Sequence, residues 1–96
     1  MVKHIVCFKL TDSSDEGKKK AKDVLRSMVG NVPTIRRIEI GCDFLCSERS
    51  FDIVLQVLLD DKAALEEYQN DKYHCDVVKT YMHANTTATV TIDYIV

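Results

Sequence analysis

Hydrophobic and polar residues alternate through residues 2–10, the first stretch of the chain. Side chains on a β-strand point alternately to its two faces, so one face carries an apolar row that only His4 interrupts. The other face carries a short apolar patch, Ile5 and Cys7, between two lysines. Because both faces are apolar enough to contact protein, the pattern predicts a central strand with helices over the His4 face.

A helical period follows this strand. Ser13 and Glu16 have the spacing of a capping box, in which two side chains satisfy backbone N–H groups of the first turn. Apolar residues then recur at positions i, i+3, i+4, i+7 and i+8, which is the pattern of an amphipathic helix. Gly30 stands where a left-handed residue commonly ends a helix. We expect this helix to span residues 14–29.

Three further segments alternate in the same way: residues 34–44, 51–59 and 86–96. Between the last two of them the helical period returns, breaks at Asn70 and Asp71 and then resumes. We therefore expect two helical pieces, with Asp71 as the cap of the second. The element order βαββαβ predicts an α+β fold, in which both helices cover one face of a four-stranded antiparallel sheet.

The composition is that of a small globular domain and excludes several function classes. A chain of 96 residues suits one domain, so we expect a single domain over residues 1–96. The formal net charge of -2 disfavours nucleic acid and anionic membrane surfaces as partners. No apolar run approaches the roughly 20 residues of a membrane span, and the chain opens directly on a strand. We therefore expect a cytoplasmic protein that binds neither nucleic acid nor membrane.

The four cysteines are expected to stay reduced in that compartment. Cys42 and Cys46 have three residues between them, a spacing that fits neither a zinc site nor a thioredoxin motif. The three glycines form no phosphate-binding loop. The sequence therefore predicts no metal and no cofactor.

The sheet face without helices would leave apolar side chains in water. Ile5, Cys7, Val54 and Leu58 are all expected on that face. A contiguous apolar patch of this kind is typical of a protein–protein contact, and closed twofold symmetry is the commonest arrangement of soluble homo-oligomers. We expect a homodimer formed through this sheet face.

Several segments resemble one known family. The first strand, VKHIVCFKL at residues 2–10, resembles the family's opening strand, and YQNDKYH at residues 68–74 resembles its YxxHPxH segment. TIDY at residues 91–94 resembles its closing strand. By these segments the chain resembles, over nearly its whole length, the stress-responsive A/B barrel (Dabb) family. The resemblance implies a ferredoxin-like protomer and a homodimer in which two sheets face each other as a dimeric α/β barrel.

The resemblance also has implications for function. Most members of the family have no assigned chemistry, some resemble stress-induced structural oligomers, and a few are cofactor-free enzymes of a plant polyketide cyclase type. In these enzymes a strand histidine and a helix histidine, helped by tyrosines, line a cavity between sheet and helices. By motif position the resemblance implies His4, His74 and Tyr68 as the corresponding residues here.

This sequence departs from the family pattern at two places. Asp71 and Lys72 replace the first histidine and the proline of the YxxHPxH segment. Leu25 stands where a second pocket tyrosine is expected on the first helix. These departures put the enzymatic role in question, whereas they leave the expected fold untouched.

The residues themselves suggest a chemical role for the same two histidines. His4 and His74 lie on faces assigned to the space between sheet and helices, so their rings are expected to approach one pocket, with the Tyr68 hydroxyl at its rim. His74 lies in the first turn of its helical piece, where the helix dipole disfavours imidazolium and leaves a neutral base. A neutral imidazole is suited to proton transfer, and a phenol could stabilise an oxyanion. The structural alternative is two half-buried histidines that satisfy a polar seam.

Two functions therefore stay open. The first is a homodimeric stress-responsive A/B barrel protein that is structural or binds a small apolar or polyketide-like ligand, without assigned chemistry. The second is a cofactor-free polyketide cyclase- or lyase-type enzyme with His4 and His74 as acid–base residues and Tyr68 beside them. A closed core filled by side chains favours the first, and an open pocket of ~300 Å³ or more favours the second.

Overall fold

A row of buried side chains on β1 occupies the centre of the sheet. The computed structural model describes residues 1–96. Its four strands are β1 (Val2–Leu10), β2 (Arg37–Cys42), β3 (Ile53–Leu59) and β4 (Thr86–Ile95). They form one antiparallel sheet in the order β2-β3-β1-β4, so β1 is central, as predicted. The predicted four-stranded antiparallel sheet is therefore confirmed.

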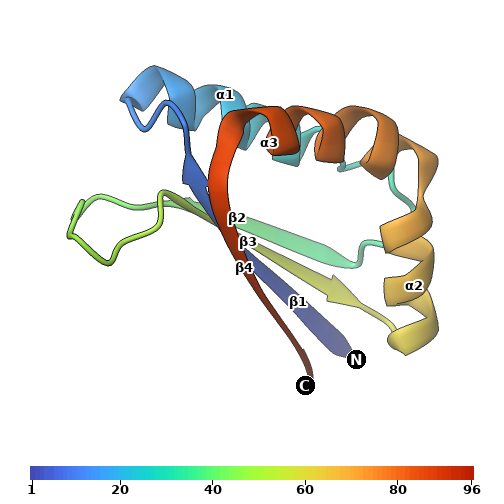
Figure 1. The fold of residues 1–96 in the computed structure, drawn as a ribbon. Helices are drawn as coiled ribbons and strands as arrows, with labels where there is room; N and C mark the ends of the chain where they lie inside the picture. The colour runs from blue at the N-terminus through green and yellow to red at the C-terminus, as the bar shows by residue number, and fades with distance from the viewer.

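The helical segments cover only one side of this sheet. They are α1 (Asp15–Arg26), α2 (Lys62–Asn70), η1 (His74–Lys79) and α3 (Thr80–Asn85). Figure 1 shows all of them on the same face, as the order βαββαβ predicts, and shows the loop between β2 and β3 projecting beyond the sheet. No helix has the length and apolar character needed to cross a membrane. The molecule thus has two layers and one uncovered sheet face.

The core lies between the helices and the sheet. On β1 and β3 every second side chain is buried, which is the alternation seen in the sequence. Leu25, Met28, Tyr68 and Val78 cover this face from the helical side, and each is at most 2% exposed. Full burial of an aliphatic side chain contributes about 1.5–3 kcal/mol to folding, so this layer is the main driving force for the fold.

The first helix begins and ends inside its predicted limits. Its N-cap is Ser14, whose Oγ accepts from the backbone N–H three residues later at 3.2 Å. The predicted capping box of Ser13 and Glu16 is therefore wrong: the cap lies one residue later, and Gly17 at the third helical position has no side chain to complete a box. Asp12 Oδ1 accepts from the Ser14 N–H at 3.0 Å and holds the chain in a turn up to that point. The helix stops at Arg26 rather than at residue 29, and the turn that follows contains Gly30 with a φ of 84°.

The break between the next two helical pieces falls where the sequence predicts it. Asp71 Oδ1 accepts from the His74 N–H at 2.9 Å, so Asp71 caps the second piece. The sequence predicts an α-helix there, whereas residues His74–Lys79 form a π-helix, whose backbone hydrogen bonds join residues five apart. A hydrophobic period cannot reveal this difference, because one wider turn moves the apolar stripe by only a single residue.

The uncovered sheet face, called the outer face below, carries apolar side chains from several strands. Ile5 and Cys7 of β1 stand opposite Ile92 and Val90 of β4. Ile92 is 60% exposed and Val90 is 53% exposed. Val54 of β3 stands opposite Cys7 on the other side. The sequence predicts only residues of β1 and β3 on this face. The apolar surface is wider than that, because the strand register also places the apolar row of β4 there.

Candidate functional site

His4 is the one polar residue in the buried row of β1, and β4 supplies its partner. The register pairs His4 with Asp93, and His4 Nδ1 lies 2.5 Å from Asp93 Oδ1. An ionised carboxylate can only accept, so Nδ1–H donates to Asp93, and in the neutral imidazole Nε2 is an acceptor. The alternation of β4 places Asp93 in a row with three threonines, but only the register shows that this row faces the helices. Sequence analysis missed Asp93 for that reason.

Tyr68 lies between the two histidines that the sequence singles out. Its ring stacks on His74 with a centroid distance of 4.3 Å and meets the His4 ring edge-on at 5.5 Å. The side chains come from β1, α2 and η1, three elements that are far apart in the sequence. The structure therefore brings His4, Tyr68 and His74 together in one row of rings.

The Tyr68 hydroxyl does not lie where the sequence argument places it. The side chain is fully buried, and its hydroxyl donates to Met28 Sδ at 3.7 Å, so the prediction of a hydroxyl at the pocket rim is wrong. The reason is the length of the phenol, which reaches past the histidines into the core. Burial, followed by the nearby charge of Asp71, raises the pKa of Tyr68 far above its ordinary value. The phenol therefore stays protonated at neutral pH.

His74 contributes a polar atom without a partner. Its side chain is buried, and Nδ1 makes no hydrogen bond. Burial is the main cause that lowers the pKa of His74, and the positive charge of Lys79 is the next. The imidazole is therefore neutral near pH 7. A buried polar atom without a hydrogen bond costs about 1–3 kcal/mol.

A small cavity, called the inner cavity below, is open beside these rings. Its volume is about 240 Å³, and its wall includes His4, Tyr68, His74 and Leu25. Leu25 thus lies where the family resemblance places a second pocket tyrosine. The volume is below the ~300 Å³ that would favour an enzyme, yet the space is not filled by side chains. The core is therefore neither completely filled by side chains nor opened by a pocket of the size expected for an enzyme.

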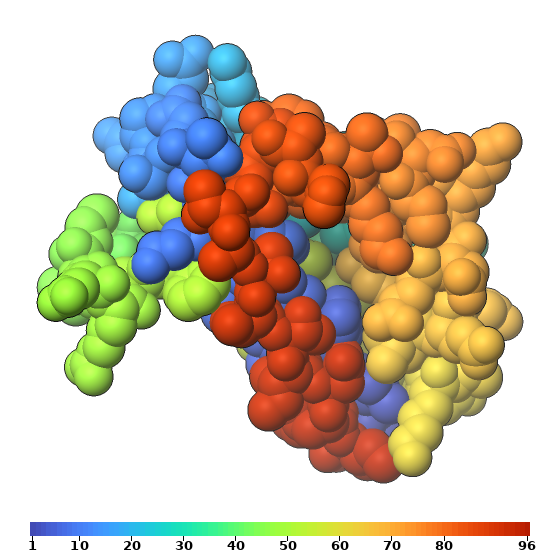
Figure 2. Space-filling model, viewed as in Figure 1, coloured from blue at the N-terminus to red at the C-terminus, as the bar shows by residue number.

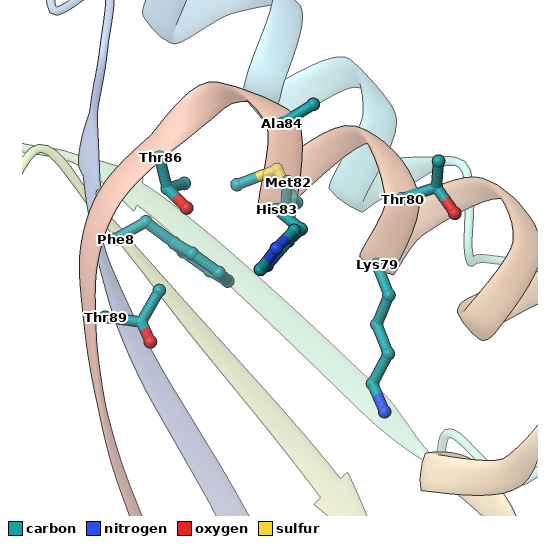
Figure 3. Close-up of a pocket in the computed structure, with 8 residues that line it drawn as sticks. All are labelled: Phe8, Lys79, Thr80, Met82, His83, Ala84, Thr86 and Thr89. Atoms are coloured by element: carbon teal, nitrogen blue, oxygen red, sulfur yellow. The ribbon is translucent and has the colours of Figure 1, made fainter.

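A larger hollow, called the outer groove below, continues from the inner cavity towards solvent. It has a volume of about 690 Å³. The two spaces share four lining residues, which are Phe8, Lys79, Met82 and Thr89. Figure 2 shows the hollow between the C-terminal helical segment and β4, and Figure 3 shows Phe8 reaching into it with Lys79 on one side and Thr89 on the other. The inner cavity therefore opens to solvent through the groove.

The structure offers no cluster of metal ligands. No three His, Cys, Asp or Glu side chains are grouped so that they could hold a metal ion. The four cysteines are free thiols, with Cys42 and Cys46 exposed. The titratable groups beside the inner cavity are the imidazoles of His4 and His74, the phenol of Tyr68 and the ammonium of Lys79.

An antiparallel sheet in the order β2-β3-β1-β4 with all helices on one face defines a ferredoxin-like fold. Within that class the chain belongs to the stress-responsive A/B barrel domain family, Dabb, whose model matches residues 2–96. The family resemblance noted in the sequence is confirmed. A comparison with curated proteins gave no match.

Solved structures support the same fold. A dimeric protein of unknown function from Bacteroides fragilis is 24% identical, with a TM-score of 0.79 over 97% of this chain and 93% of that chain. A dimeric ferredoxin-like protein of unknown function from Thermobifida fusca is 16% identical, with a TM-score of 0.84 over 99% and 90%. A Dabb family protein from Mesorhizobium loti is 20% identical, with a TM-score of 0.74 over 98% and 94%. These likenesses describe the fold and leave the chemistry to the site.

The burial of His74 predicts a pH dependence of stability. The pKa of His74 in the folded chain is lowered from 6.5, so the unfolded chain takes up a proton first as the pH falls. The stability contributed by a neutral His74 is therefore complete above about pH 6.5 and is lost progressively below it. Denaturant unfolding between neutral and mildly acidic pH should show a larger loss for the wild type than for His74→Gln.

The exposed His83 provides the control for this measurement. His83→Gln should keep the wild-type pH dependence, because its side chain is not buried. Equal pH dependences for wild type and His74→Gln would mean that His74 is not desolvated in solution.

Proposed function

We propose that the chain, as a single domain over residues 1–96, forms a homodimeric barrel whose protomers each bind a small organic molecule in the inner cavity. The observation that carries the proposal is the open space of about 240 Å³ in the core, with the rings of His4, Tyr68 and His74 in its wall. Protein interiors are close-packed and contain few voids larger than a water molecule. A small ligand would fill this space and contact the rings.

The walls of the cavity fit a small, largely apolar ligand. Val6, Leu25, Leu55 and Val78 supply apolar surface, and a few polar groups converge on the same space. This combination is typical of small-molecule sites. A volume of about 240 Å³ equals the share of about eight water molecules in liquid water, which suits a single ring or a short chain. A small polyketide-like compound is within this class.

Two observations support the homodimer. The outer face exposes an apolar row on β4 that includes Val90, Ile92 and Tyr94, beside the apolar residues of β1 and β3. The Bacteroides fragilis and Thermobifida fusca proteins of the same fold are described as dimeric. Pairing two outer faces around a twofold axis would remove this surface from water.

Ile92→Glu should convert the dimer into a folded monomer. The side chain is 60% exposed in the single chain, so the change leaves the core intact, but it would place a carboxylate inside the proposed contact. Val29→Glu is the matched control, because Val29 is 58% exposed and lies outside the sheet. Light scattering should give a dimer for the wild type and Val29→Glu and a monomer for Ile92→Glu. A wild-type monomer at micromolar concentration would contradict the proposal.

Ligand binding can be tested with 4-hydroxybenzamide, a neutral single-ring compound of suitable size. Titration followed by NMR should shift resonances of His4, Tyr68 and His74. His74→Phe should weaken binding about tenfold or more, since it removes the polar imidazole from the cavity wall. Lys72→Gln, an exposed change that does not touch the cavity, should bind as the wild type does. Absence of saturable shifts at the cavity residues would reject the binding proposal.

The contact between His4 and Asp93 favours acid–base catalysis as a second function. A carboxylate that accepts from Nδ1–H holds the ring in one orientation and stabilises the imidazolium that forms when Nε2 takes a proton. His4 would then remove a proton from carbon or oxygen of a bound ligand, with neutral His74 as the second acid–base group. The buried hydroxyl of Tyr68 is directed at Met28, so Tyr68 would act by holding both rings. This is the cofactor-free chemistry of a cyclase or lyase type.

The catalytic function predicts faster exchange of the α-hydrogens of a small ketone such as cyclohexanone in heavy water. Proton transfer by a placed histidine contributes about 10²–10⁴ in rate, so His4→Ala and Asp93→Asn should remove most of any acceleration. His83→Ala should retain it, because His83 lies outside the inner cavity. If the histidines are only structural, no variant changes the exchange rate and His4→Ala instead lowers stability by about 1–3 kcal/mol.

A further inference from the structure

One positive charge stands where the inner cavity meets the outer groove. Lys79 lines both spaces, and neither lining contains another Lys, Arg, Asp or Glu side chain. The carboxylate of Asp93 accepts from His4 Nδ1, and Asp93 is in neither lining. The path from solvent to the row of rings therefore passes a single cation.

The ammonium group of Lys79 is not neutralised by the protein. The ion pairs of the structure do not include it. Its only hydrogen bond is a long one of 3.5 Å to the backbone oxygen of Gln69. The side chain is exposed, so its charge is available to a molecule that enters the groove.

The π-helical turn explains why this charge shares a cavity with His74. In an α-helix a residue five positions on lies about 140° around the axis, so Lys79 would point away from His74. In η1 the hydrogen bonds join residues five apart, which places the fifth residue nearly above the first. His74 and Lys79 are the two ends of such a turn, and both line the inner cavity. The wide turn thus gives the cavity two different polar contacts on one side.

These two contacts select a class of ligand. The imidazole of His74 in the cavity wall is polar, and the ammonium of Lys79, which forms no ion pair, favours a negative charge. The remaining wall is mainly apolar. Hydrogen bonds between ionised groups are about twice as strong as neutral ones, so a carboxylate should be preferred over an uncharged group of the same shape.

We propose that Lys79 makes the inner cavity selective for small organic carboxylates, which bind with their ring or chain beside Tyr68 and their carboxylate at the mouth. This inference rests on the proposed binding function, because it names the class of molecule that the same cavity takes. The ligand places a hydroxyl or similar group at His74 and its charge at Lys79. Phe8, Met82 and Thr89 form the remainder of the mouth.

A matched pair of probes tests the selectivity. The compounds 4-hydroxybenzoate and 4-hydroxybenzamide have the same ring and hydroxyl and differ in charge. Calorimetry or NMR titration should show that the wild type binds the benzoate about fivefold to tenfold more tightly than the benzamide. High salt should reduce this ratio, because the mouth is open to solvent.

Three variants assign the preference to Lys79. Lys79→Gln should bring the ratio to about one while the benzamide affinity stays unchanged, and Lys79→Arg should keep the preference. Lys72→Gln removes an equally exposed positive charge from the same helical piece, outside both cavities, and should keep the wild-type ratio. All three changes are at exposed positions, and a thermal melt confirms that each variant is folded.

The outcomes separate this inference from the function on which it rests. Equal wild-type affinities for the two probes, or a preference that survives in Lys79→Gln, would overturn the role of Lys79 and leave the binding function standing. A ratio that falls equally in Lys72→Gln would show an effect of net charge alone and would also overturn it. If neither probe shifts the cavity resonances, the binding function and the inference fail together.

Discussion

The central position of β1 is the constraint on which the rest of the structure depends. Its strand pairing on both sides fixes which residues of β3 and β4 stand beside each of its own. The even-numbered side chains face the helices and the odd-numbered ones face outward. One register therefore sets the buried core, the partner of His4 and the apolar outer face at the same time. A shift of a strand's register by one residue would turn its buried side chains to the outer face and its outer side chains to the core, and in β4 it would separate Asp93 from His4.

Much of the fold follows from patterns that lie close together in the sequence. Alternation predicts the four strands, and the helical period with Asp71 predicts the break between the later helical pieces. The misses are local and have physical causes. The helix cap moves from Ser13 to Ser14 because Asp12 holds the preceding turn. The π-helix escapes detection because η1 still buries His74 and Val78, and its wider turn leaves only one apolar residue, Val77, exposed, at 42%.

The residues of the candidate site also fall into two groups, those that sequence patterns predict and those that only the structure reveals. Face assignment and the family resemblance identify His4, Tyr68 and His74, and the structure brings these three together. Asp93 requires knowledge of how β4 pairs with β1, and Lys79 requires knowledge of the π-helical turn. Neither kind of information is present in a local pattern of residue types. Sequence patterns therefore predict the three rings of the site, whereas its charged residues, Asp93 and Lys79, are found only from the three-dimensional structure.

Adjacent positions on β1 serve two different surfaces, and this has a thermodynamic consequence. His4 faces the cavity, while Ile5, the next residue, faces the proposed partner, with only the thickness of one backbone between them. A ligand that displaced His4 would also displace Ile5, so occupancy of the proposed site and self-association would become linked equilibria. Linkage is reciprocal: whatever factor the ligand applies to the association constant, association applies to the ligand's affinity. A single strand would then transmit cooperativity between two cavities that never touch.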